Sequence, residues 1–432
     1  MVDITFLGSA QEVGRSCILI NDTYLLDAGI KISEEGQEYP MMNLLDPYKI
    51  QAVFLSHAHL DHTGALPLLN NNGLNCSIYC TKITKKTTKI LLNDSIHIEM
   101  LSVKEPAYDQ ENITKIMSLM KPVDYNREYN QQYKDGNKEK KIDFTFLDAG
   151  HIPGSSSILL KIDGKTILYS GDINTLTTRL TQGLNYFNQN QLKNIDCFIC
   201  ESTYGDRDHI PRQQTEKEFL QAIKDTLKKG GKVIIPTFSV ARAQELAILV
   251  SQQNFTVPIY LDGMAKKVTD LFLSESDSIK NGNLLRQAMK KVQYVKKRDD
   301  RVTIVKEQCI IITTSGMVAG GPVIDYLKYL YNDQKTAILL TGYQAPNCNG
   351  RLLLDEQRAF VDGIGLNVRC TIKQFDFSAH AGKTELIALI KALNPKIVLF
   401  NHGEKESCFA LANAMPKTIT AIVPELGETI TI

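Results

Sequence analysis

The sequence has almost equal numbers of positive and negative residues, so it lacks an excess of either charge. Lys and Arg together number 49 and Asp and Glu number 48, so the net charge at neutral pH is +1. A chain with so little net charge has no overall basic field, and any contact with nucleic acid has to come from local patches. With 43% hydrophobic and 22% charged residues, the composition is that of a soluble globular protein. A chain of 432 residues is too long to fold around one ordinary hydrophobic core, so we expect two domains.

Long apolar runs are absent as well. The chain has no stretch of about 20 apolar residues, which is the length that a membrane-spanning helix needs. Residues 1–6 lack the basic start and the long apolar run of a signal peptide. We therefore expect a cytoplasmic protein without membrane contact.

A disulfide framework and a dinucleotide fingerprint are also missing. The nine cysteines are odd in number and irregularly spaced. Cys197 and Cys200 have the C-x-x-C spacing, but they lie inside the apolar run 195–200, so we interpret them as core residues and not as a redox or zinc-binding pair. Gly8 and Gly14 bracket a loop, but their spacing is wrong for dinucleotide binding and no helix follows directly.

Histidine is scarce, yet three of the eight histidines fall within six consecutive residues. The stretch from His57 to His62 reads His-Ala-His-Leu-Asp-His and follows the apolar run 50–55, which is typical of a buried strand. One histidine in such a place is most often a solvated turn residue. Four ligand-type side chains in six residues instead indicate a metal site, because imidazole and carboxylate groups bind zinc, iron and manganese. His57 and His59 are spaced to hold one metal ion, and Asp61 and His62 to face a second.

Later segments repeat this pattern of a strand followed by a histidine or an aspartate. The runs 144–147, 166–169, 374–377 and 397–400 precede His151, Asp172, His380 and His402, respectively. Six of the eight histidines thus lie in four strand-end loops, which is where α/β folds assemble their sites. Asp27 also closes a strand, and it is either a turn residue or a carboxylate that orients a ligand histidine. His97 and His209 lack such a context, and their roles stay open.

The middle of the chain has a different pattern. Between residues 215 and 340, helical segments alternate with the short apolar runs 233–235, 258–261, 309–312 and 337–340. This alternation predicts a mostly parallel sheet that is covered by helices on both faces. Residues 101–141 are polar and carry no candidate chemistry, and we interpret 138–141 as a solvated turn.

The motifs resemble those of a known superfamily. The run from His57 to His62, together with His151 and with Asp172 in Ser-Gly-Asp, is similar to the metal-binding motifs of the metallo-β-lactamase superfamily. Glu201 in Glu-Ser-Thr-Tyr-Gly, His380 in Ser-Ala-His and His402 in Asn-His-Gly resemble the additional motifs of the β-CASP ribonuclease family. The runs 236–245, 314–317 and 342–345 are similar to the inserted domain of that family. The compact archaeal and bacterial members, which are related to the cleavage and polyadenylation specificity factor endonuclease, are the most similar.

The resemblance implies an α/β fold, in which an αββα metallo-β-lactamase sandwich carries an inserted parallel-sheet α/β β-CASP domain. The expected domains are 1–204 for the first part of the sandwich, 205–352 for the insertion, and 353–432 for the C-terminal part of the sandwich.

The resemblance also implies two Zn²⁺ ions and a set of ligands for them. The first ion is expected on His57, His59 and His151, the second on Asp61, His62 and His402, with Asp172 bridging both. Asp61, His380 and Glu201 are the expected catalytic residues. His380 is expected to protonate the leaving 3′-oxygen of a cleaved phosphodiester, while Glu201 orients its ring.

The implied substrate is single-stranded RNA. A histidine at the position of His402 goes with RNA-cleaving members of the family, which favours RNA over DNA. Arg242, Ser315 and Gly316 are candidate phosphate contacts. The alternative is that Arg242 is an ordinary surface charge and that Ser315 and Gly316 only form a tight turn. Whether cleavage is internal or proceeds from the 5′ end is open, and a homodimer would be in keeping with the family.

Two other functions have to be weighed. The first is a catalytically inactive RNA-processing scaffold, which is disfavoured because every expected ligand position is filled. The second is a small-molecule hydrolase of the superfamily, which is disfavoured by the insertion, because compact hydrolases of this kind lack such a domain.

Overall fold

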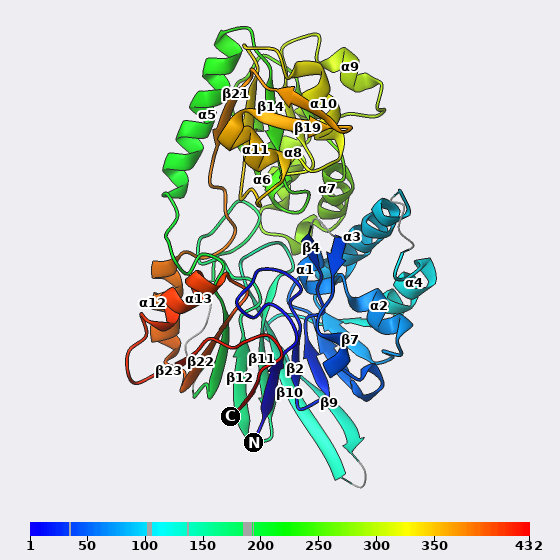
Figure 1. Ribbon diagram of the computed structural model, residues 1–432, viewed down its shortest axis with the longest axis vertical. Helices are drawn as coiled ribbons and strands as arrows, with labels where there is room; N and C mark the ends of the chain where they lie inside the picture. Colours follow the sequence, from blue (N-terminus) through cyan, green and yellow to red (C-terminus); the bar gives the residue numbers. More distant parts are fainter. Residues whose placement is uncertain (34–35, 102–105, 136–137, 185–191, 193) are drawn as a thin grey trace. The chain divides into compact units, whose positions relative to one another are not determined.

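The computed structural model describes residues 1–33, 36–101, 106–135, 138–184, 192 and 194–432 (Figure 1). The chain forms two compact units. The first unit comprises Met1–Thr177, Thr181–Asp208 and Ala379–Ile432, and the second comprises Thr178–Leu180 and His209–Ser378. Among the residues described, no helix has the length and apolar character to cross a membrane.

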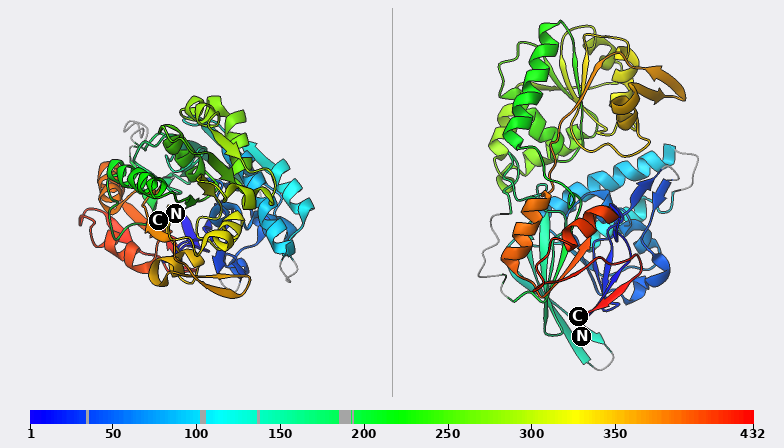
Figure 2. Two further views of the ribbon diagram at one scale, coloured as in Figure 1. Left: turned by 90° about the horizontal axis from the view of Figure 1, so that it is seen from above. Right: turned by 60° about the vertical axis from the view of Figure 1, so that its left-hand side comes forward.

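The first unit contains two seven-stranded sheets. The first sheet has the order β24 (Thr429–Thr431), β1 (Asp3–Phe6), β2 (Ile18–Ile20), β3 (Tyr24–Leu26), β6 (Ala52–Phe54), β7 (Ser77–Cys80) and β8 (Met120–Pro122). The second sheet has the order β23 (Thr420–Ile422), β22 (Ile397–Asn401), β13 (Cys197–Glu201), β12 (Lys165–Tyr169), β11 (Ser156–Ile162), β10 (Lys138–Asp148) and β9 (Glu128–Asp135). The two ends of the chain lie side by side in the first sheet, because β1 pairs with β24 (Figure 2).

Apolar clusters on both faces of the two sheets hold this unit together. Side chains of both sheets form one cluster, in which the rings of Phe54 and Phe144 lie 4.9 Å apart. The other face of the first sheet packs against α2 (Leu66–Asn71) and α4 (Gln110–Leu119), and that of the second packs against α12 (Lys383–Leu393) and α13 (Lys405–Ala412). The order helix, sheet, sheet, helix confirms the predicted αββα sandwich. Two further helices, α1 (Leu60–Thr63) and α3 (Lys82–Leu101), and the hairpin of β4 (Lys31–Ser33) and β5 (Gly36–Glu38) complete the unit.

The C-x-x-C pair belongs to the core of this sandwich. Strand β13 is buried on both faces, which explains its unbroken apolar sequence. Cys197 faces the layer between the sheets, and Cys200 faces the helices. Burial raises the pKa of both thiols. The two sulfur atoms therefore lie on opposite faces as packing groups, as predicted.

The second unit is built on a parallel sheet with helices on both faces (Figure 2). The strand order is β16 (Val292–Tyr294), β15 (Ile259–Asp262), β17 (Ile310–Thr313), β14 (Val233–Pro236), β18 (Ala337–Leu340) and β21 (Thr371–Gln374). One face packs against α5 (Arg212–Lys228), α6 (Arg242–Ser251) and α7 (Ala265–Ser274), and the other against α10 (Pro322–Leu330) and α11 (Asn349–Glu356). The unit also contains α8 (Gly282–Ala288), α9 (Asp300–Ile304) and the hairpin of β19 (Arg358–Val361) and β20 (Ile364–Asn367). The predicted parallel α/β domain is thus confirmed.

The extent of this unit differs from the expected insertion 205–352. The unit continues to Ser378, because β21 pairs with β18 as a further parallel strand. Thr178–Leu180 also belongs to it. Arg179 binds the Glu216 carboxylate through both terminal nitrogens, at 2.5 and 2.8 Å, and the backbone N–H of Leu180 donates to Glu245 at 2.7 Å. The pairing of β21 and the attachment of Thr178–Leu180 both depend on contacts between residues far apart in the sequence. Local sequence patterns do not reveal such contacts.

The polar segment 101–141 contains more regular structure than expected. Asp109 caps α4 in a reciprocal capping box, and β9 pairs with β10 in a long hairpin (Figure 1). The interpretation of 138–141 as a solvated turn was wrong, because these residues begin β10, with Lys140 opposite Tyr133 and Lys141 opposite Gln132. Charged side chains are common on strands near the edge of a sheet, where they hinder pairing with other chains. Residues 102–105 and 136–137 lie outside the described part of the chain.

Candidate metal centre

The predicted ligands meet because their strands end at one edge. Strands β12, β13 and β22 are parallel neighbours, and β11 runs antiparallel to both β10 and β12. The carboxyl ends of these four parallel strands therefore share an edge. They are followed or closed by four of the predicted site residues: His151 after β10, Asp172 after β12, Glu201 at the end of β13, and His402 after β22. The loop after β6 adds His57 and His59, and α1 adds Asp61 and His62.

His380 reaches this centre by a different route. The strand that precedes it, β21, belongs to the sheet of the second unit, and residues 375–382 form no strand. Its chain re-enters the first unit at Ala379. The expectation that His380 follows a strand of the sandwich was therefore wrong, although the residue itself lies at the predicted centre.

The two carboxylate oxygens of Asp172 face two different histidine groups. Oδ2 lies 3.5 Å from His57 Nε2 and 3.7 Å from His151 Nε2. Oδ1 lies 3.4 Å from His62 Nε2 and 3.2 Å from His402 Nδ1. One carboxylate with a histidine group on each oxygen is the geometry that bridging of two cations requires.

His59 and Asp61 complete one group each. His59 Nδ1 lies 3.0 Å from His57 Nε2 and 3.3 Å from His151 Nε2, so three ring nitrogens converge on one point. Asp61 Oδ2 lies 3.5 Å from His402 Nε2 and 3.9 Å from His62 Nε2. Nitrogens that approach one another this closely gain little from mutual hydrogen bonds, whereas a shared cation would satisfy all of them.

Buried atoms without partners support this interpretation. His62 Nε2, His402 Nε2 and Asp172 Oδ1 are buried and make no hydrogen bond within the described structure. A buried polar group without a partner costs free energy, about 1–3 kcal/mol for each one. All three atoms point into the same cluster of histidines and aspartates. The residues present therefore fit a metal ion.

The outer nitrogens of the ligand histidines are held by other groups. His62 Nδ1 lies 2.7 Å from Asp27 Oδ2, and His57 Nδ1 lies 3.0 Å from the Ser56 hydroxyl. His151 Nδ1 donates to the backbone carbonyl of Ala379 at 2.8 Å. These contacts fix the tautomer that leaves Nε2 of each ring for a cation. Of the two roles considered for Asp27, this contact with His62 favours the orienting carboxylate.

Asp27 is itself fixed by three donors. Its carboxylate accepts the backbone N–H and the hydroxyl of Ser56, and also the Tyr169 hydroxyl, each at 2.7 Å. Sequence analysis missed Ser56 and Tyr169. Tyr169 ends an apolar strand, where a tyrosine usually indicates packing, and only its place before Ser-Gly-Asp hinted at the site.

Backbone conformation also shapes the centre. Asp27 and His402 have positive φ angles of 59° and 49°, which non-glycine residues adopt mainly where the surroundings impose them. Gly171, at φ 55°, precedes Asp172, and a Cβ there would lie 2.6 Å from that of Ser56. Ser-Gly-Asp therefore needs its glycine so that the Asp172 loop can pack against the histidine loop.

Burial and charge set the protonation of the centre. Burial lowers the pKa of His57 and His151, which keeps both rings neutral, as a metal ligand has to be. Burial also opposes ionisation of Asp172, but the surrounding histidines, His402 and His62 foremost, hold its pKa well below the usual range. The Asp172 carboxylate is therefore ionised at neutral pH.

His380 and Glu201 contact each other at the rim of the centre. His380 Nδ1 lies 3.1 and 3.0 Å from the two carboxylate oxygens of Glu201, and its Nε2 lies 4.0 Å from Asp172 Oδ2. Glu201 is fully buried and also accepts the backbone N–H of Ile173 at 2.6 Å. Side-chain exposure is 19% for His380 and 32% for Asp61, and His59 is partly exposed as well. The other predicted ligands have exposures of 0–4%: His57, His62, His151, Asp172 and His402. His59, Asp61 and His380 are therefore the members of the centre that solvent reaches.

The three predicted phosphate contacts lie in the second unit. Arg242 begins α6 and donates through Nη1 to the Thr341 carbonyl. Ser315 and Gly316 lie in the loop after β17, and the Ser315 hydroxyl accepts the backbone N–H of Ala319 at 3.2 Å. All three occupy the carboxyl edge of the parallel sheet, and their role stays a prediction.

The two remaining histidines have other surroundings. His97 is exposed on α3, and His209 lies 2.7 Å from the Asp376 carboxylate within the second unit. Burial opposes ionisation of Asp376, but His209 lowers its pKa overall.

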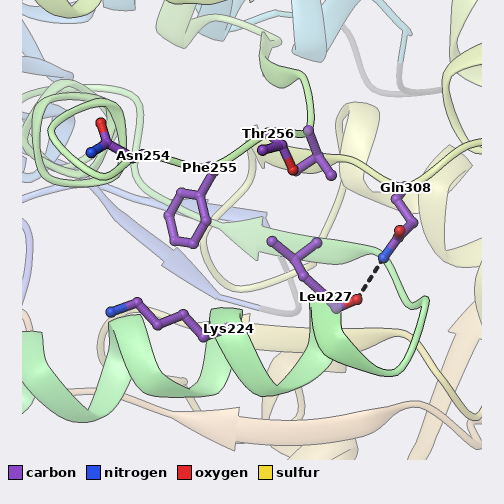
Figure 3. Close-up of a pocket in the computed structure, with 7 residues that line it drawn as sticks. Lys224, Leu227, Asn254, Phe255, Thr256 and Gln308 are labelled. Carbon is purple, nitrogen blue, oxygen red and sulfur yellow. Dashed lines mark hydrogen bonds between the residues drawn. The ribbon is translucent and has the colours of Figure 1, made fainter.

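A pocket of the second unit has a different chemistry (Figure 3). It is lined by Lys224, Leu227, Asn254, Phe255, Thr256, Val257 and Gln308. These residues lie before β14, β15 and β17, at the amino edge of the sheet, and Gln308 is bound to the Leu227 carbonyl at 2.7 Å. The pocket contains no histidine or carboxylate and none of the predicted site residues.

Replacing Asp27 with Asn should weaken metal binding without unfolding the protein. The amide keeps the shape of the carboxylate but loses the charge that orients and polarises His62. The loss of such a partner typically lowers metal affinity by about 10- to 100-fold. Competition with a zinc chelator measures this affinity, and Asp143→Asn on β10 serves as the control. Equal zinc affinities of Asp27→Asn and the unmodified protein would contradict the role of Asp27.

Comparisons with known proteins agree with this fold and centre. Three family models match the chain: a metallo-beta-lactamase superfamily domain over residues 19–202, a Beta-Casp domain over 243–353, and a Zn-dependent metallo-hydrolase RNA specificity domain over 365–424. A protein of unknown function from Enterococcus faecalis has a similar fold, with a TM-score of 0.63 and 17% identity over the full length of both chains.

Relatives from archaea align over nearly the whole chain. Probable RNase MJ4 of Methanocaldococcus jannaschii is 39% identical over the full length of both proteins. RNase aCSPSF2 of Saccharolobus solfataricus is 32% identical over 99% of this chain and 85% of the relative. Transcription termination factor FttA of Thermococcus kodakarensis is 31% identical over 96% of this chain and 69% of the relative. The chain therefore belongs to the β-CASP ribonuclease family of the metallo-β-lactamase superfamily.

Proposed function

We propose that this protein is a zinc-dependent ribonuclease that hydrolyses phosphodiester bonds of single-stranded RNA. The observation that carries the proposal is the position of Asp172, which has a histidine group on each carboxylate oxygen and His380 at the rim. The family membership and the names of the ribonuclease relatives support RNA as the substrate. We also propose a cytoplasmic location, as the sequence pattern predicts, and a homodimer, which rests on the family resemblance alone and which light scattering would test.

Two zinc ions fit the two groups of ligands. His57, His59 and His151 would hold one ion, Asp61, His62 and His402 the other, and Asp172 both. When bound, such a pair supplies an acidified water and neutralises charge on the scissile phosphate. The orienting contacts of Asp27, Ser56 and Ala379 keep the ring nitrogens aimed at the ions without rearrangement.

His380 supplies the proton for the leaving group. Glu201 accepts the Nδ1–H of the ring, so that Nε2–H is presented at the rim, where the leaving 3′-oxygen would lie. Because Glu201 also accepts the N–H of Ile173, one buried carboxylate positions both His380 and the residue after Asp172. Proton transfer from a positioned group contributes about 10²- to 10⁴-fold to a reaction rate.

The pH dependence of cleavage should report this acid. Burial lowers the pKa of His380, but the Glu201 and Asp172 carboxylates outweigh it and raise the pKa to about 9. A general acid works in its protonated form, so activity is present below this pKa and is lost as the pH rises through it. Metal cations bound beside Asp172 would lower the pKa of His380. The loss of activity is therefore expected at or below pH 9.

The variant Glu201→Gln separates this effect from others. It removes the negative charge that raises the pKa of His380, so its alkaline loss of kcat should occur at a lower pH than in the unmodified protein. Profiles of kcat against pH for both proteins measure the difference. An alkaline limb at the same pH in both would contradict the pairing.

The substrate is tested with RNA labelled at its 5′ end and with a DNA of the same sequence. Cleavage of the RNA by the zinc-loaded protein, abolished by a chelator and restored by zinc, is the expected result. Internal fragments would show an endonuclease, and release of mononucleotides from a 5′-monophosphorylated end would show an exonuclease. Hydrolysis of a lactam or thioester with the RNA left intact would favour the small-molecule hydrolase instead.

A further inference from the structure

Two exposed aromatic rings stand out among the loops at the carboxyl edge of the second unit's sheet. Phe238, in the loop after β14, is 36% exposed, and Tyr343, in the loop after β18, is 50% exposed. Strands β14 and β18 are parallel neighbours, so that their loops leave the sheet side by side. The carboxyl edge of a parallel sheet is where α/β folds most often bind ligands.

Hydrogen bonds tie the loops around these rings together. Gln344 is almost fully buried, and its side chain donates to the carbonyls of Gly316 and Gly342, at 3.1 and 3.2 Å. The Gln374 side chain donates to the same Gly342 carbonyl at 2.9 Å. Thr341 donates through its hydroxyl to the Pro236 carbonyl at 2.8 Å and so ties the two strand ends together.

Two loops pack closely around Phe238 because each has a glycine, which lacks a Cβ, at the point of contact. A Cβ at Gly342 would lie 3.2 Å from the Phe238 ring and 3.1 Å from Arg242 Nη1, and one at Gly316 would lie 3.0 Å from the Phe238 backbone nitrogen. Phe238, Arg242 and the loop of Tyr343 therefore share one small surface. We call these three residues the aromatic platform.

Strained backbone is concentrated in the same loops. Ala241 has a φ of 62° and Val318 a φ of 57°. Positive φ is unfavourable for a residue with a side chain and most of all for a β-branched one such as valine. Such conformations persist where the surroundings impose them, and they cluster at ligand-binding sites.

The chemistry of this surface fits a nucleic acid strand better than a protein. A protein partner would need a contiguous apolar patch, whereas Phe238 is flanked by Thr237 and Ser239 in the chain and lies beside Arg242, Gly316 and Gly342. Isolated aromatic rings beside a fixed guanidinium are the arrangement by which proteins stack unpaired bases and hold the phosphates between them. We propose that Phe238 and Tyr343 stack against bases of single-stranded RNA while Arg242 contacts its backbone, an inference that rests on the proposed ribonuclease function.

Stacking predicts how substitutions change cleavage. A stacked base contributes about 1–3 kcal/mol, so Phe238→Ala and Tyr343→Ala should each raise KM for single-stranded RNA about tenfold or more, with kcat retained. Phe238→Trp should keep the KM of the unmodified protein, and Phe238→Leu, which keeps apolar volume without a ring face, should not. Because stacking tolerates every base, the effect should be similar for RNAs of different sequence.

Phe360 provides a matched control in the same unit. It is 50% exposed on the β19–β20 hairpin, so Phe360→Ala removes an aromatic ring that is as exposed as Tyr343 and more exposed than Phe238. We expect this variant to cleave RNA with unchanged KM. Zinc content and thermal midpoint, measured for every variant, show that the fold and the metal centre are retained.

RNAs that lack a single base identify the stacked nucleotide. With the unmodified protein, removal of the base at one or two positions should raise KM. With Phe238→Ala, removal of the base at one of those positions should have no further effect, because its stacking partner is already gone. Unchanged KM values for Phe238→Ala and Tyr343→Ala would overturn the aromatic platform. So would an increase in KM on base removal that is as large in these variants as in the unmodified protein. In either case the ribonuclease function would stand. If the unmodified protein cleaves no RNA, both fail together.

Discussion

Replacing Asp172 with Ala is expected to abolish RNA cleavage and to remove metal from the protein. Asp172 gives one oxygen to each histidine group, so its loss takes a ligand from both proposed ions at once. It also leaves a cavity among buried histidines. Metal ions at such a centre supply several kcal/mol of transition-state stabilisation, so the rate should fall by about 10³-fold or more.

Zinc analysis and cleavage of labelled RNA measure this result together. Zinc per chain should fall below that of the unmodified protein, and no RNA fragment should appear. Asp196→Ala is a suitable control, because Asp196 lies before β13 in the same sheet, where it binds Lys396 and the N–H of Thr166. If Asp172→Ala kept its full zinc content and cleaved RNA, Asp172 would not be a bridging ligand.

Replacing His380 with Ala should separate catalysis from metal binding. The ring lies 4.0 Å from Asp172 at the rim, and its other nitrogen is held by Glu201, so it is placed as an acid and not as a ligand. Cleavage should fall by about 10²- to 10⁴-fold, the usual contribution of a general acid. Zinc content should stay at that of the unmodified protein.

The residual activity of this variant is informative as well. Without the acid, kcat should lose the alkaline limb that the raised pKa of His380 produces. An RNA with a better leaving group, such as a 3′-thio linkage at the scissile position, should recover part of the lost rate, because a 3′-thiolate leaves without a proton. If the zinc were lost together with the activity, His380 would be a ligand and its assigned role wrong.

The sequence was most informative about the centre itself. Histidines and aspartates directly after apolar runs predicted ligands at strand ends, and the structure brings all seven together with His380 and Glu201. The ligands could be predicted because four of them lie within six consecutive residues. Few functions other than metal binding place four histidine and aspartate side chains so close together in a sequence. The parallel sheet of the second unit was equally accessible, because helices and strands alternate with clear apolar patterns.

Features that depend on distant contacts were not accessible. The pairing of β21 with β18 extends the second unit beyond residue 352, and nothing near Thr371 reveals it. Tyr169 is indistinguishable from a core residue until its hydroxyl meets Asp27. The β9–β10 hairpin was missed because its charged residues lack the alternation of a strand that is buried on one face.

Cleavage of single-stranded RNA by the zinc-loaded protein tests the central claim most directly. The account predicts that RNA labelled at its 5′ end is cut, that DNA of the same sequence is not, and that cleavage stops with a chelator and in Asp172→Ala. A protein that carries its zinc and leaves the RNA intact would contradict it.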